Sequence, residues 1–230
     1  RLGLSEADLA CGPQLPRYEP ASSHLLATQQ KPSRLHNNCS GKHTGFLTVA
    51  KHLGASISGY VAMAHPVQQA VLTSVARLSG VAAPASGIDG CAAPNFALPL
   101  TGFARALAQI AGKKTPGAAR ILTAMTTYPE LVSGTGRMCA KLMRAATGGV
   151  AVKMGAEGVY AAMLPGQGLG IAIKIDDGAV RGAEVAVALI LEKLGVLDPA
   201  RSLATAPILN TVGAVVGEVR PSEVLRAIAP

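Results

Sequence analysis

The sequence contains no tryptophan and only three phenylalanines and four tyrosines. A core formed by this chain must therefore consist mainly of aliphatic side chains and close contacts of glycine and alanine. Charged residues make up only 15% of the chain, whereas hydrophobic residues make up 49%. This composition indicates a globular protein, and 230 residues are enough to bury a sizeable core.

The chain also lacks the patterns of a nucleic-acid-binding or membrane protein. Its net charge is +8, but lysines and arginines are scattered singly, and the densest pair is Lys113 with Lys114. No aromatic residues interleave with them to stack on bases. No apolar run reaches the roughly 18 residues of a membrane span. We therefore expect neither nucleic acid nor membrane as a partner, and the positive charge leaves an acidic small molecule.

Four cysteines in 230 residues are too few and too widely spaced for a disulfide framework. The sequence also shows no secretory leader with a charged start and an apolar run. We expect a reducing, cytoplasmic setting.

The chain is expected to form a single α+β domain, residues 1–230, in three parts. Residues 1–35 carry four prolines, which predict an irregular arm. Residues 36–149 are predicted to be mainly helical, because apolar residues recur with helical spacing in 44–54, 65–80, 100–110 and 115–125.

From residue 150 the apolar period changes to two. It predicts an antiparallel meander of strands at 150–154, 158–164 and 169–175, and the stretch 179–195 predicts a helix that packs on it. An extended piece at 212–219 and a helix after Pro221 complete this third part, residues 150–230. Helices followed by strands and another helix indicate an α+β fold rather than an alternating one.

Reactive side chains are concentrated in the octet HNNCSGKH, residues 36–43. Cys39 lies in this octet and Cys91 lies in a second glycine-rich stretch, two residues after Asp89. A free cysteine is often only a small hydrophobic residue in a core. Two thiolates from separate loops also make a credible zinc site.

Two sulfurs alone do not complete a zinc site. His36 and His43 are the conventional candidates for the remaining ligands. Lys42 could bind only as a neutral amine, a form that its ordinary pKa of about 10.4 disfavours at neutral pH unless a metal or desolvation removes the proton.

Two further stretches carry candidate substrate chemistry. Lys153 lies on a predicted strand and is followed by Gly155, which is similar to the lysine-bearing strand of serine acylases, although a solvated lysine at a sheet edge has the same pattern. In VSGTGR, residues 132–137, Ser133, Thr135 and Arg137 could line a small-molecule pocket, and Arg137 could pair with a carboxylate.

Five blocks carry a resemblance to a known family. They are LHNNCSGKHTGFL, HPVQQAV, GIDGCAAPNFALPL, ELVSGTGR and KMGAEGVYAAMLPGQGLGIAIKIDDG, in that order. The chain resembles the bacterial L-asparaginase II family of the type first known from rhizobia. That resemblance implies a fold like that of serine β-lactamases and glutaminases, with an antiparallel sheet flanked by helices.

The resemblance also implies a reaction and the residues that carry it. The reaction is hydrolysis of the side-chain amide of L-asparagine to L-aspartate and ammonia, through an acyl-enzyme formed by a serine that a lysine activates. The family's zinc ligands fall on Cys39, Lys42 and Cys91, with Asp89 and His43 as supporting partners. Its strand lysine best matches Lys153.

The chain departs from the family pattern in one respect. The family's nucleophile lies in a Ser-x-x-Lys segment, and these 230 residues contain none. We therefore expect the chain to correspond to the C-terminal part of a longer protein, without its N-terminal strands, and to be inactive or nearly so alone. We also expect it to form a homodimer or to be completed by the missing segment. Two alternatives stay open: a non-catalytic zinc-binding or regulatory protein, and a related amidohydrolase that acts on glutamine or another amide.

Overall fold

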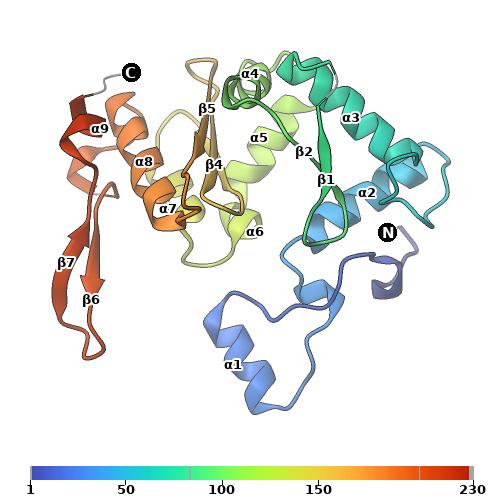
Figure 1. The fold of residues 1–230 in the computed structure, drawn as a ribbon, viewed down its shortest axis with the longest axis horizontal. Coiled ribbons are helices and arrows are strands. Elements are labelled where there is room, and N and C mark those ends of the chain that lie inside the picture. The colour runs from blue at the N-terminus through green and yellow to red at the C-terminus, as the bar shows by residue number, and fades with distance from the viewer. Residues whose placement is uncertain (1, 83, 202, 228–230) are drawn as a thin grey trace. The chain divides into compact units, whose positions relative to one another are not determined.

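The computed structural model describes residues 2–82, 84–201 and 203–227. The chain forms two compact units, Arg1–Leu98 and Pro99–Pro230, where the sequence predicts one domain (Figure 1). The boundary at residue 98 also differs from the predicted part boundaries at residues 35 and 149. We call these units 1 and 2 and describe each by itself.

Unit 1 is mainly helical and carries one small hairpin. Its elements are η1 (Glu6–Asp8), α1 (Glu19–Ala27), η2 (Arg34–His36), α2 (Ser40–His52), α3 (Pro66–Ser79), β1 (Ser86–Ile88) and β2 (Pro94–Phe96). The prediction that residues 1–35 are irregular is wrong for α1. Pro20 lies in the first turn of that helix, where its missing N–H costs no hydrogen bond, so this proline starts a helix instead of breaking one.

The two longer helices of unit 1 begin and end for local reasons. The His65 side chain accepts from the Val67 N–H and Pro66 opens α3, while Gly80 ends it in the left-handed conformation, as the sequence predicts. Helix α2 begins at Ser40, four residues before the predicted stretch, so the octet runs directly into its first turn. The core beside these helices consists of Leu9, Cys11, Leu47, Tyr60, Cys91 and Ala93.

Unit 2 contains the predicted meander. Strands β3 (Ala151–Met154), β4 (Val159–Leu164) and β5 (Leu169–Lys174) pair antiparallel in that order. The other elements are α4 (Leu100–Ala111), α5 (Ala118–Thr127), α6 (Pro129–Ser133), α7 (Met138–Ala145), α8 (Val180–Lys193), η3 (Pro199–Arg201), β6 (Ala206–Leu209), β7 (Val215–Val219) and α9 (Glu223–Ala227). Helices α6 and α7 and strand β6 are additional to the predicted elements.

Helices cover both faces of the meander, with α4 and α5 on one side and α7 and α8 on the other (Figure 1). Tyr160, Ala162 and Leu164 point into the core with α7 and α8. Ala161 and Met163 point into the core with α4 and α5. Strand β4 is therefore buried on both faces, which explains its nearly uninterrupted apolar sequence. Mixed helices and antiparallel strands agree with the predicted α+β class.

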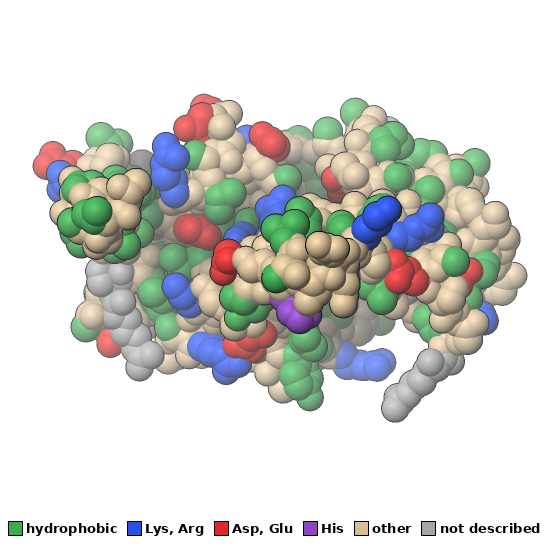
Figure 2. All heavy atoms as spheres, turned by 90° about the horizontal axis from the view of Figure 1, so that it is seen from below, with side chains coloured by type: hydrophobic (Ala, Val, Ile, Leu, Met, Phe, Trp, Pro, Cys, Tyr) green, Lys and Arg blue, Asp and Glu red, His purple; other side chains and the backbone are tan. Residues whose placement is uncertain are grey.

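Strands β6 and β7 form a separate antiparallel hairpin with several exposed apolar side chains: Ile208, Leu209, Val215 and Val216. Among the described residues, none of the helices combines the length and the apolar character that crossing a membrane requires. On the face in Figure 2, basic and acidic side chains are interspersed.

Candidate metal centre

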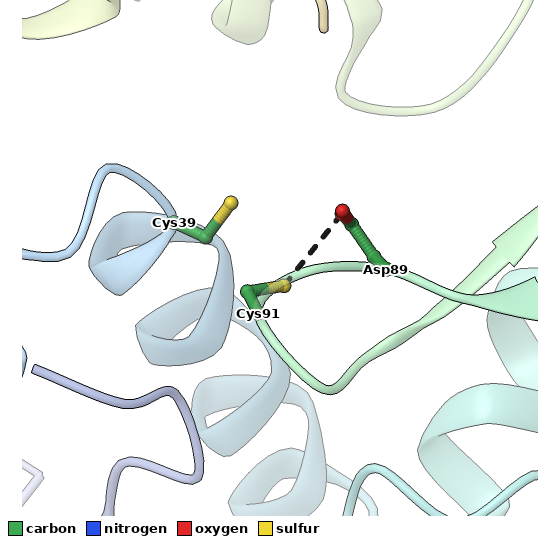
Figure 3. Close-up of side chains that lie close together, drawn as sticks. All are labelled: Cys39, Asp89 and Cys91. Carbon is green, nitrogen blue, oxygen red and sulfur yellow. Dashed lines mark hydrogen bonds between the residues drawn. The ribbon is translucent and has the colours of Figure 1, made fainter. Parts of the chain in front are cut away.

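Three side chains that could hold a metal gather in unit 1. The Sγ atoms of Cys39 and Cys91 and a carboxylate oxygen of Asp89 all lie within 4.8 Å of one another. Figure 3 shows Cys39 at the start of α2, and Asp89 and Cys91 on the loop between β1 and β2. The structure thus brings together two stretches that the sequence separates by about 50 residues.

The octet positions Cys39 through an asparagine. Cys39 occupies the residue before α2, and its N–H donates to Oδ1 of Asn37 at 2.8 Å. Asn37 is buried, and its Nδ2 donates to the Gly12 carbonyl at 2.8 Å. This side chain therefore anchors the helix start to the N-terminal segment and sets the direction from which Cys39 enters the site.

The loop of residues 89–93 positions Asp89 and Cys91. The Asp89 N–H donates to the Ala93 carbonyl and the Ala92 N–H donates to the Asp89 carbonyl, both at 2.8 Å. Ala92 adopts a left-handed conformation with φ of 72°, which is strained for a residue with a Cβ. The closed loop places the Cys91 thiol 3.6 Å from Oδ2 of Asp89 (Figure 3).

Lys42 joins the same cluster. Its Nζ donates to Oδ2 of Asp89 at 2.7 Å. The bond to Lys42 is the main reason that the pKa of Asp89 lies below its ordinary value. Burial alone would lower the pKa of Lys42, but hydrogen bonds to Asp89 and Cys91 outweigh it and raise that pKa. Without a metal, the pair is thus an ammonium and a carboxylate.

The cluster is chemically suited to zinc. Burial raises the pKa of the Cys39 thiol, although the Lys42 charge opposes the shift, so this sulfur keeps its proton at neutral pH until a cation displaces it. Two sulfurs and a carboxylate oxygen match the ligands of zinc, and the Lys42 nitrogen could join them only after losing a proton. Magnesium and calcium prefer oxygen ligands throughout.

The two histidines of the octet take other roles. His36 accepts the Ser33 N–H through Nδ1 at 2.9 Å, in the short helix η2. His43 is 0% exposed, and its Nδ1 lies 2.6 Å from the Tyr60 hydroxyl. Burial, followed by the Lys42 charge, lowers the pKa of His43, so its ring is neutral. Neither histidine belongs to the group of metal-binding atoms within the described part of the chain.

The other predicted site residues belong to unit 2. Lys153, the last residue but one of β3, donates to the Met154 carbonyl at 2.6 Å, and Arg137 contacts the Met154 sulfur at 3.1 Å. Ser133 ends α6, and its Oγ is buried without a hydrogen bond to the described residues. Thr135 lies on the exposed turn that follows.

The Tyr60 hydroxyl contacts His43, and Asn37 accepts the Cys39 N–H. Neither Tyr60 nor Asn37 is among the predicted site residues. Tyr60 lies 17 residues after His43, between α2 and α3, and no local pattern marks it. Asn37 stands inside the reactive octet, so its position there was an available signal.

A search among curated proteins found no match. A family model for L-asparaginase II matches residues 1–221, nearly the whole chain. This range includes both halves of the candidate metal cluster and the strand that carries Lys153. The chain therefore belongs to the L-asparaginase II family.

Proposed function

We propose that this protein hydrolyses the side-chain amide of L-asparagine to L-aspartate and ammonia, with a zinc ion held by Cys39, Lys42 and Cys91. Membership of the L-asparaginase II family supports an amidohydrolase. The observation that carries the metal centre is the meeting of two thiols, an amine and a carboxylate in unit 1.

The Lys42–Asp89 contact fixes the position of the lysine nitrogen in the cluster, but it also stabilises the charged ammonium. To bind a metal, the Lys42 ammonium must lose one proton, which frees a lone pair on Nζ. The neutral amine keeps two N–H groups, so it can still donate to Asp89. In the structure without a metal, Nζ of Lys42 and Oδ2 of Asp89 are 2.7 Å apart. Zinc bound there supplies a positive charge that can polarise a carbonyl oxygen. Asp89 is the competing third ligand.

Separate roles are proposed for four residues of unit 2. The proposed route is an acyl transfer in which Lys153 takes the proton of a serine that lies outside these 230 residues. Arg137 is proposed to bind the substrate carboxylate through two parallel hydrogen bonds, assisted by Ser133 and Thr135. Arg137 contacts the sulfur of Met154, the residue that follows Lys153 in β3.

A second candidate is a structural zinc site. Cys91 belongs to the buried core of unit 1 and Cys39 packs against it, so a metal there would tie α2 to the β1–β2 loop. In that case zinc removal would lower the melting temperature of the protein without any amide being turned over.

Ammonia release from an amide panel separates these functions. We expect the chain extended by its upstream coding sequence to hydrolyse L-asparagine, and the 230-residue chain alone to be nearly inactive. Lys153→Met in the extended form should abolish turnover. Lys174→Met is the matched control, because Lys174 lies at the end of β5 and, like Lys153, donates to the carbonyl of the next residue.

Equal activity in the two lysine variants would exclude Lys153 from the reaction. An extended form that binds zinc and turns over no amide would favour the structural zinc site. Preferred turnover of glutamine would keep the metal centre but change the substrate.

A further inference from the structure

The two sulfurs of the metal cluster lie close enough to react with each other. The Sγ atoms of Cys39 and Cys91 lie within 4.8 Å of one another, and both cysteines are free thiols. A disulfide has an S–S length of about 2.05 Å, so the sulfurs would need to approach by no more than about 2.8 Å. Figure 3 shows the two side chains next to each other, one at the start of α2 and one on the β1–β2 loop.

The two thiols differ in their access to solvent. Cys39 is half-buried, whereas Cys91 is 4% exposed. Cys39 precedes α2, and its thiol makes no capping hydrogen bond to the described residues of that helix. Rotation about its Cα–Cβ bond can therefore move this sulfur without loss of a helix cap. A small oxidant would reach Cys39 first, and Cys91 would be the neighbouring thiol that reacts with the oxidised sulfur.

Oxidation would leave the carboxylate of the cluster with its stronger hydrogen-bond donors. The Cys91 thiol is a weak donor, 3.6 Å from Oδ2 of Asp89. Nζ of Lys42 donates to the same oxygen at 2.7 Å, and the Gly90 N–H donates to Oδ1 at 2.7 Å. A disulfide would remove only the thiol hydrogen, so Asp89 would not become an unpaired charge.

We propose that Cys39 and Cys91 are a redox-sensitive pair, which a peroxide joins as a disulfide and a reductant restores. Zinc binds thiolates, so a chain in the disulfide form has lost two of its proposed ligands. Oxidation would therefore release the metal, and bound metal and the disulfide exclude each other. This release rests on the proposed function, because it needs zinc at the cluster, whereas the disulfide itself does not.

One molecule of hydrogen peroxide oxidises one pair. The Cys39 thiolate attacks a peroxide oxygen, the O–O bond breaks, and the hydroxide that leaves takes up the proton that the thiol lost. Cys91 then attacks the sulfur of the resulting sulfenic acid, the S–S bond forms, and the S–O bond breaks. The second hydroxide leaves as water with the proton of Cys91. The two thiols lose two electrons, and the peroxide is reduced to two water molecules.

Peptide mass spectrometry of the metal-free 230-residue chain tests the disulfide. Trypsin cleaves after lysine and arginine, so the four cysteines fall on four separate peptides: 2–17, 35–42, 78–105 and 138–141. The chain is treated with hydrogen peroxide until its mass is constant, its remaining thiols are alkylated, and it is digested without a reductant. We expect peptide 35–42 to be joined to peptide 78–105, and we expect dithiothreitol to separate them.

Cysteine variants and zinc affinity complete the test. Cys39→Ser and Cys91→Ser should each abolish the joined peptides. Cys11→Ser is the matched control, because Cys11 is buried in the same core as Cys91 and is the competing partner, so its loss should leave the joined peptides unchanged. In competition with a chromophoric chelator, the oxidised wild type should bind zinc at least about tenfold more weakly than the reduced chain, and reduction should restore the affinity.

Each other outcome contradicts a stated part of the inference. A link between Cys91 and Cys11 overturns the pairing, and so does Cys39 oxidised to sulfinic or sulfonic acid while Cys91 keeps its thiol. A joined chain that binds zinc as tightly as the reduced chain overturns the release of metal. A reduced chain that binds no zinc overturns the proposed metal centre and the release with it, while the joined peptides still decide whether the disulfide forms.

Discussion

The Nζ atom of Lys42 lies 2.7 Å from Oδ2 of Asp89, a residue 47 positions further along the chain. Both side chains are about one-third exposed, at 37% and 34%, so this ion pair by itself adds little to stability. Its significance is positional, since it holds a nitrogen beside the sulfurs of Cys39 and Cys91.

The substitution Lys42→Arg asks whether that nitrogen binds metal. Arginine keeps the positive charge and can pair with Asp89, but its guanidinium does not lose a proton to become a ligand. We expect the variant to bind zinc at least about tenfold more weakly than the wild type, measured by competition with a chelator.

Asp89→Asn is the companion variant. Its amide oxygen can still accept from Lys42, so a supporting role for Asp89 predicts a smaller loss of affinity than Lys42→Arg causes. The opposite order, with Lys42→Arg near wild type and Asp89→Asn defective, would make Asp89 the third ligand and Lys42 only its ion-pair partner.

Cys39→Ser and Cys91→Ser should each abolish tight zinc binding, because a hydroxyl is a far poorer zinc ligand than a thiolate. Metal content after dialysis, measured by mass spectrometry, checks this. Cys11→Ser is the control, since Cys11 is 0% exposed in the same core but lies outside the group of metal-binding atoms. Zinc retained in both test variants would place the metal elsewhere.

Glu184, in unit 2, predicts that the stability of the folded chain depends on pH. Burial raises the pKa of this carboxyl, and the opposing charges of Arg137 and Lys141 do not cancel the shift. The folded state thus holds the Glu184 proton more tightly than the unfolded chain does. The stability that the protonated carboxyl contributes is fully present below its pKa in the unfolded chain and is lost as the pH rises through its pKa in the folded state. Glu184→Gln should therefore raise the melting temperature at about pH 8 and change it little at about pH 4.

Glu130→Gln should show the opposite sign. A bidentate pair with Arg144, at 2.7 Å for both bonds, lowers the pKa of this exposed carboxyl. The stability that the ionised Glu130 contributes is present above its pKa in the unfolded chain and is lost as the pH falls through its pKa in the folded state. This variant should have a slightly lower melting temperature at neutral pH. Parallel pH profiles for the two glutamine variants would contradict both assignments.

Gly170→Ala should destabilise unit 2 by roughly 3 kcal/mol, at the upper end of the range for overpacking. A Cβ at this position in β5 would lie 2.3 Å from the Ala104 carbonyl oxygen and from the Ala108 nitrogen in α4, and backbone atoms cannot move aside cheaply. Denaturant unfolding measures the loss. Gly166→Ala, in the turn before β5, meets nothing within 4 Å and should be nearly neutral.

The apolar periodicity of the sequence correctly predicts the helices and strands that form because of their own local residues. Helix α3 combines an apolar stripe with Pro66 at its start and Gly80 after its end, so each local signal agrees with the observed helix. The meander is predicted because its strands alternate and their turns are short and glycine-rich. Strand β6 was not predicted, because its pairing with β7 depends on a partner rather than on its own sequence.

The candidate site is predictable only in part, for the same physical reason. Cys39, Lys42 and Cys91 stand out as reactive residues in glycine-rich stretches, and the structure places them together. Tyr60 does not stand out, because its contact with His43 exists only in the folded chain. The proposed role of Lys153 stays a prediction, since it depends on a serine that these residues do not identify.

The left-handed Ala92 has a kinetic consequence for metal capture. Two backbone hydrogen bonds close the loop of residues 89–93. The Asp89 carboxylate and the Cys91 sulfur therefore lie on one rigid loop before a metal ion binds. An incoming cation would find these two donors preorganised and would need to recruit only the start of α2. We therefore expect the metal ion to bind first to Asp89 and Cys91. The approach of Cys39 would then be the final and slower step of binding.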